Sequence, residues 1–138
     1  MRIAVIDGQG GGIGKHITEK IRKELGNNVE IIALGTNSVA TSMMLKAGAN
    51  EGATGENAII CTVDDVDVIT GSLSILVANS MLGELTPSIA AAVSQSKAMK
   101  VLLPIGRTRV EIIGVQQEPL PHLIDMLVDN LKKNKGVE

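Results

Sequence analysis

Short apolar runs alternate along this chain with stretches whose apolar residues recur at helical spacing. Residues 2–6 (RIAVI) and 29–35 (VEIIALG) are rich in β-branched side chains, which is typical of buried strands. Between them, apolar side chains recur every four residues from Ile13 to Leu25, and charged side chains occupy the positions in between. This spacing predicts an amphipathic helix that ends at Gly26.

The middle of the chain continues this alternation. Residues 36–48 (TNSVATSMMLKAG) predict a second helix, with Thr36, Asn37 or Ser38 as its N-cap. A glycine-rich connector follows at residues 49–57, before a short helix or strand, and residues 66–70 (VDVIT) predict a third strand. Residues 72–82 (SLSILVANSML) are apolar without a period, so helix and strand both remain open.

The last third of the chain begins with a clear helix start at Thr86 and Pro87. Two apolar runs, residues 101–105 and 109–115, are separated by a connection that contains Gly106, which predicts an antiparallel hairpin. Apolar side chains then recur at helical spacing from Leu120 to Leu131, and residues 132–138 are expected to be a frayed tail. Together these elements predict one domain, residues 1–138, with an α/β fold. We expect a three-layer Rossmann-like sandwich whose mostly parallel sheet ends in a C-terminal antiparallel hairpin.

Composition narrows the classes of partner. The formal net charge is −2, which favours neither nucleic acid nor an anionic membrane surface as a partner. Cys61 is the only cysteine, and the chain has no apolar stretch of membrane-spanning length, so we expect a cytoplasmic protein. Phe, Tyr and Trp are all absent, which excludes aromatic stacking on a ligand and acid/base chemistry by tyrosine.

The sequence VIDGQGGGIGKH, residues 5–16, predicts a ligand site. A strand, a glycine-rich turn and a helix N-terminus together present unpaired amides and a positive helix dipole to an anion. The expected binding residues in this loop are Asp7, Gly8, Gln9, Gly10, Gly11, Gly12, Ile13, Gly14 and Lys15. The alternative is that the glycines only allow tight packing of strand against helix.

Three known glycine-loop patterns each match this stretch only in part. The dinucleotide fingerprint G-x-G-x-x-G fails, because its third glycine would fall at Ile13 or Lys15. The spacing of Gly8, Gly12 and Gly14 resembles the cofactor loop of short-chain dehydrogenases, although the catalytic tyrosine of that family is impossible here. The stretch GGIGKH also resembles a deviant Walker motif, but His16 stands where the hydroxyl ligand of Mg²⁺ is needed.

A second group of expected binding residues follows the second predicted strand: Gly35, Thr36, Asn37 and Ser38. NAD sites place an acidic residue here to hold the ribose hydroxyls, and no acid occurs between Ala33 and Asn50. NADP or another phosphorylated nucleotide is therefore expected in preference to NAD.

The sequence names no catalytic residue and no metal site. Four polar residues near the predicted strand ends have no assignable role: Asn79, Ser80, Glu84 and Arg107. The acidic loop around Asp65 has no histidine beside it, so metal binding is not expected there.

Taken together, the loop, residues 33–59 and residues 79–87 resemble a family of small bacterial proteins catalogued only as a domain of unknown function. The resemblance implies a compact bacterial domain with a Rossmann-like loop, and it supplies no reaction.

The leading hypothesis is a small protein that binds a nucleotide or another phosphorylated small molecule. The alternatives are a nucleotide-dependent enzyme whose site is completed by oligomerisation, and an oligomeric structural protein without a ligand. We expect a homo-oligomer, most simply a dimer, because a small domain without aromatic residues has little core to bury. The apolar segment 72–82 and five methionines suit a contact surface: Met43, Met44, Met81, Met99 and Met126.

Overall fold

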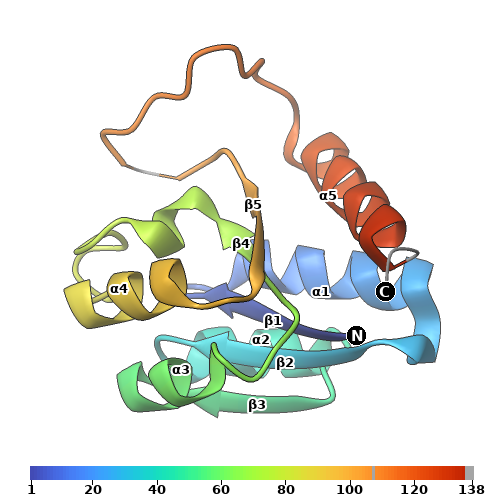
Figure 1. The fold of residues 1–138 in the computed structure, drawn as a ribbon, viewed down its shortest axis with the longest axis horizontal. Helices are drawn as coiled ribbons and strands as arrows, with labels where there is room; N and C mark the ends of the chain where they lie inside the picture. The colour runs from blue at the N-terminus through green and yellow to red at the C-terminus, as the bar shows by residue number, and fades with distance from the viewer. Residues whose placement is uncertain (107, 136–138) are drawn as a thin grey trace.

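The computed structural model describes residues 1–106 and 108–135, and its centre is a five-stranded sheet (Figure 1). The strands are β1 (Arg2–Asp7), β2 (Glu30–Gly35), β3 (Glu51–Thr54), β4 (Val68–Ser72) and β5 (Met99–Leu103). Their order is β3-β2-β1-β4-β5, and every neighbouring pair is parallel. The α/β fold with a parallel sheet is therefore confirmed.

Helices cover both faces of this sheet. They are α1 (Gly12–Leu25), α2 (Ser38–Lys46), α3 (Glu56–Thr62), α4 (Pro87–Gln95) and α5 (Leu120–Lys135), with short 3₁₀ helices η1 (Gly26–Asn28) and η2 (Leu73–Leu76). One core cluster joins the sheet to α1, α2 and α5, and the other joins it to η2, α3 and α4. In β1, Ile3 and Val5 enter the first cluster while Ala4 and Ile6 enter the second, so the strand is apolar on both faces.

Local signals place the helix starts correctly. Asn37 is the N-cap of α2, and its side-chain oxygen accepts a hydrogen bond from the Ala40 amide at 2.9 Å. Thr86 caps α4 in the same way by accepting from the Ile89 amide at 3.2 Å, and Pro87 occupies the first turn. Both caps satisfy an amide that the helix itself leaves without a partner.

The expected antiparallel hairpin is wrong for the residues that the structure describes. β5 pairs in parallel with β4, and residues 109–115 form neither strand nor helix. Pro104 follows β5 directly and Gly106 has a φ of 140°, so the chain leaves the edge of the sheet instead of turning back along it. Arg107 lies outside the described residues.

Two further segments differ from expectation. The connector 49–57 contains β3, where a Cβ on Gly52 would come within 2.8 Å of Thr41 Cγ2, so glycine lets this edge strand pack on α2. The apolar segment 72–82 forms η2 and a series of turns, and Ile75 within it is fully buried in the chain's own core. The start of the segment therefore contributes to the core, whereas Leu82 at its end is 96% exposed.

At the C-terminus, α5 continues to Lys135, beyond the expected start of a frayed tail at residue 132. Residues 136–138 lie outside the described part of the chain. Within the described residues, none of the helices combines the length and apolar character needed to cross a membrane.

Candidate functional site at the switch point of the sheet

The sheet reverses its strand order between β1 and β4, since the chain builds β2 and β3 on one side of β1 and then β4 and β5 on the other. Open α/β sheets bind ligands outside the carboxyl ends of the strands at such a switch point. A cavity of about 490 Å³ lies there. It is lined by Asp7, Gly8, Gln9, Ile13, Ser72, Ser74, Met81 and Gly106.

The glycine-rich loop forms one tight turn. The Gly11 amide donates to the Gly8 carbonyl at 3.0 Å, and Gly11 has a φ of 75° as the N-cap of α1. The helix α1 begins at Gly12, directly after this turn. The turn is therefore short and aims the first amides of α1 outward beside the cavity.

Three of the five glycines are needed for packing. A Cβ on Gly8 would lie 2.4 Å from Thr36 Oγ1, a Cβ on Gly11 would lie 2.8 Å from Ala40 Cα, and one on Gly14 would lie 2.7 Å from Met44 Sδ. For these positions the simple packing explanation of the glycines is sufficient.

Gly10 and Gly12 are different. Both are exposed, neither has a positive φ, and a Cβ on either would meet nothing within 4 Å. Within the described chain, the amides of Gly10, Gly12 and Ile13 donate to no protein acceptor. Glycine at these two positions leaves the backbone open to approach from outside.

Asp7, at the end of β1, holds the two ends of the glycine-rich loop together. Its carboxylate accepts hydrogen bonds from the Gly8 amide at 2.8 Å and from the Gly14 amide at 2.6 Å, and only 6% of the residue is exposed. Burial raises the pKa of Asp7 above its ordinary value, and the two amide hydrogen bonds oppose that rise without cancelling it. Asp7 is thus a structural acceptor for the N-terminus of α1.

Glu84 joins the glycine-rich loop to the residues that follow β2. The sequence pattern gave no role for Glu84. Its Oε1 accepts from the Gln9 amide at 2.8 Å, from Thr36 Oγ1 at 2.7 Å and from Asn37 Nδ2 at 2.8 Å. The hydrogen bond from the Gln9 amide, with those from Thr36 and Asn37, lowers the pKa of Glu84. We call Glu84 and these three partners the Glu84 clamp.

The Glu84 clamp removes the reason for expecting NADP. That expectation rested on the absence of an acidic residue near the end of β2, whereas Glu84 brings a carboxylate to Thr36 and Asn37 from a distant part of the chain. The sequence could not show this, because 48 residues separate Glu84 from Thr36.

Three other residues predicted to bind the ligand, Gly35, Ser38 and Lys15, do not line the cavity. A Cβ on Gly35 would lie 2.2 Å from Thr41 Oγ1, so this glycine permits the close start of α2. Ser38 is exposed on the first turn of α2 and does not line the cavity. Lys15 lies beyond the cavity on α1, with its Nζ 4.0 Å from Glu19 Oε1.

The turn that carries Glu84 is held in an unusual conformation. Asn79, Met81 and Leu82 all have positive φ, between 56° and 67°. Ser80 is buried and donates to the Ser74 carbonyl at 2.6 Å, which ties the turn to η2. Left-handed backbone at three non-glycine residues is costly, and such strain clusters at functional sites. In this protein, the turn with left-handed backbone places Met81 in the wall of the cavity and brings Glu84 to the Gln9 amide.

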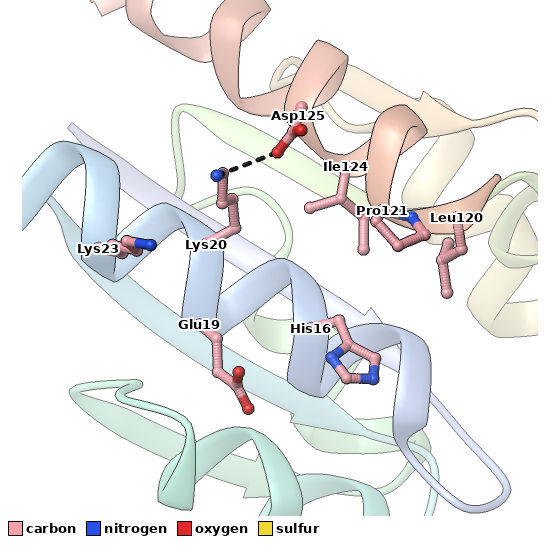
Figure 2. Close-up of a pocket in the computed structure, with 8 residues that line it drawn as sticks. All are labelled: His16, Glu19, Lys20, Lys23, Leu120, Pro121, Ile124 and Asp125. Carbon is pink, nitrogen blue, oxygen red and sulfur yellow. Dashed lines mark ion pairs between the residues drawn. The ribbon is translucent and has the colours of Figure 1, made fainter. Parts of the chain in front are cut away.

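A second cavity, of about 460 Å³, lies between α1 and α5 (Figure 2). Its apolar lining residues, Leu120, Pro121 and Ile124, all belong to α5, and Lys20 of α1 forms an ion pair of 3.0 Å with Asp125 of α5. The same lysine also pairs with Glu24 at 3.2 Å, so these charges fasten α5 to α1. This cavity is away from the carboxyl ends of the strands, so the switch-point cavity is the better candidate site.

Fold and site together define a parallel α/β domain with a glycine-rich turn at the switch point of its sheet. Within that class, the chain belongs to the family described as Domain of unknown function (DUF3842), whose model matches residues 2–136. This confirms the family resemblance seen in the sequence.

Other comparisons add a distant likeness. A universal stress protein from Archaeoglobus fulgidus matches with a TM-score of 0.40 and 19% sequence identity, over 74% of this chain and 97% of that chain. A likeness at this level carries no argument about function. No curated protein matches the chain.

Proposed function

We propose that this protein binds a nucleotide or another phosphorylated small molecule at the switch-point cavity. The observation that carries the proposal is the set of three free amides at the positive end of α1: Ile13 lines the cavity, and Gly10 and Gly12 precede it in the same exposed turn. Open space at Gly10 and Gly12 leaves room for phosphate oxygens to approach these donors.

The charges around the loop favour a ligand with one phosphate group at this position. Asp7 and Glu84 already occupy the amides of Gly8, Gln9 and Gly14, so three donors remain. A polyphosphate would bring several negative charges close to these two carboxylates and would be repelled. A single phosphate matches the three remaining donors.

The rest of the ligand would lie in the cavity. Ser72 and Ser74 offer hydroxyl groups for a sugar, and Ile13 and Met81 offer apolar surface for a base. The Asp7 carboxylate is engaged by the Gly8 and Gly14 amides, and the other described lining residues include no general base for the serines, so we propose binding without chemistry. We place this function in the cytoplasm on the sequence evidence, and propose that the protein acts as a dimer.

A thermal-shift screen tests the proposal. The probes are AMP, ADP, ATP, NAD, NADP and a set of sugar phosphates, with inorganic phosphate as the reference. A ligand at about 100 times its Kd stabilises the folded state by about 2.7 kcal/mol, which is several degrees in Tm for a domain of this size. The expected order is monophosphate ligands above triphosphates.

The Gly12→Val variant locates the site. We expect it to fold, since its Cβ meets nothing within 4 Å, and to lose the ligand-induced shift, because the branched side chain covers the free amides. Ser38→Val is the matched control, with a branched residue at the exposed first position of α2. Retention of the full shift by Gly12→Val would place the ligand elsewhere, and no shift with any probe would reject the function.

A further inference from the structure

Residues 108–118, here called the arm, stand clear of the body of the molecule between β5 and α5 (Figure 1). Val110, Ile112 and Val115 in the arm are 45–47% exposed, and Ile113 is 92% exposed. Monomeric proteins rarely leave so many large apolar side chains together in solvent, and a patch of this kind marks a contact with a partner. The arm therefore has the character of an interface segment.

The neighbouring strand β5 is an open edge. Among the described strands it pairs with β4 alone, so its other side presents unpaired backbone groups. Proteins usually protect such an edge with a projecting lysine. The one charged residue of β5, Lys100, is instead folded back, with its Nζ donating to the Ser96 carbonyl, and Met99 is 56% exposed. The edge is thus unprotected on the side next to the arm.

A groove connects the edge to α5. It has a volume of about 480 Å³ and is bounded by Val101 and Leu103 from β5, Leu123 and Met126 from α5, and the arm at one end. Met126 is 54% exposed on this side of α5. The open edge, the groove and the arm thus form one continuous apolar surface.

Charge and size indicate a second copy of this chain as the partner. The arm carries one Arg and two Glu; the carboxylate of Glu118 lies 2.9 Å from His122 Nδ1 of the same chain, which leaves Arg109 and Glu111 free to face each other when two arms approach. β5, the arm and the exposed face of α5 together approach the roughly 20 residues per side that a stable interface uses. A two-fold axis would let each arm and each groove meet their counterparts reciprocally.

We propose that two copies of the chain pair through this surface, with Ile113 at the tip of each arm packed into the groove between β5 and α5 of the other copy. The inference rests on the proposed dimer and specifies where its interface lies. It makes no use of the ligand site.

Multi-angle light scattering on the purified full chain tests the interface. We expect the wild type to have twice the 14.4 kDa mass of one chain at micromolar concentration. Ile113→Asp should weaken the dimer at least about 30-fold, as loss of a central interface anchor does, and shift the mass to that of one chain. Met126→Asp, on the groove side, should shift it in the same direction. Circular dichroism confirms that each variant is folded.

Leu82→Asp is the matched control, because Leu82 is equally apolar and 96% exposed but lies on the turn beside the switch-point cavity. Its mass should remain that of the dimer. A wild type of 14.4 kDa would overturn both the dimer and the interface. A dimer that survives both Ile113→Asp and Met126→Asp, or that Leu82→Asp dissociates, would overturn this interface alone. Ligand-induced thermal shifts are read separately, so the proposed binding function stands or fails independently.

Discussion

Replacing Glu84 with alanine should destabilise the protein by about 2–3 kcal/mol at neutral pH. One carboxylate oxygen accepts three hydrogen bonds between 2.7 and 2.8 Å, from Gln9, Thr36 and Asn37. Hydrogen bonds to a charged group contribute about 1.5–3 kcal/mol each when buried. The three donors are exposed or half-buried, so in the variant they can bond to water instead. We therefore expect the total loss of stability to equal the free energy of about one such hydrogen bond.

The pH dependence gives the same reasoning a second test. Because the clamp lowers the pKa of Glu84 in the folded state, the unfolded chain binds more protons in the carboxyl range. The stabilising contribution of the Glu84 carboxylate is therefore present at neutral pH and is lost as the pH falls below about 4. The difference between wild type and Glu84→Ala should therefore shrink on acidification.

Urea denaturation at a series of pH values measures both effects as shifts in the unfolding midpoint. Glu84→Gln keeps an acceptor oxygen without the charge and should lose only about 1 kcal/mol. Glu19→Ala is the control for a surface carboxylate, since its ion pair with Lys15 is 4.0 Å long and contributes little. Equal midpoints for Glu84→Ala and wild type at pH 7, or a difference that does not change with pH, would refute the clamp.

Two further predictions concern Asp7 and the N-cap residue Thr86. Burial raises the pKa of Asp7, so the folded state binds more protons and the stability that Asp7 contributes falls as the pH rises above about 4. The urea midpoints of wild type and Asp7→Asn should converge as the pH rises, opposite to the trend for Glu84→Ala, and a widening difference would contradict this. Thr86→Ala should lower the free energy of unfolding by about 1 kcal/mol, because it removes the N-cap of α4, whereas Thr86→Ser should be nearly neutral. Equal urea midpoints for Thr86→Ala and wild type would exclude a capping role.

The parts of the fold that the sequence predicted are those with local causes. The stripe from Ile13 to Leu25 and the caps at Asn37 and Thr86 act within a few residues, so their helices can be read from the chain. β3 and the arm could not be assigned in this way. β3 exists because Gly52 allows close packing on α2 and because β2 offers an edge, and both conditions are non-local. The arm has strand-like composition, but within the described residues it pairs with no strand.

The candidate site shows the same division. The sequence located the loop that binds the ligand in our proposal, because strand, turn and helix start are contiguous. It missed the Glu84 clamp, since 75 residues separate Glu84 from Gln9 and the turn that delivers the carboxylate has no recognisable spacing. The expectation of NADP loses its premise for this reason, because it assumed that only nearby sequence could supply an acid beside the residues after β2; the preference for NADP over NAD stays a prediction.

The five glycines of the loop gave one signal in the sequence, but the structure divides them into two groups with different causes. Gly8, Gly11 and Gly14 are required by neighbouring side chains or backbone, so their presence would be explained without any ligand. Gly10 and Gly12 have no such neighbour, and glycine at the start of a helix is otherwise less favourable than many residues. The argument for a ligand therefore rests on these two positions alone. Variants of the first group would report on folding, and variants of the second would report on binding.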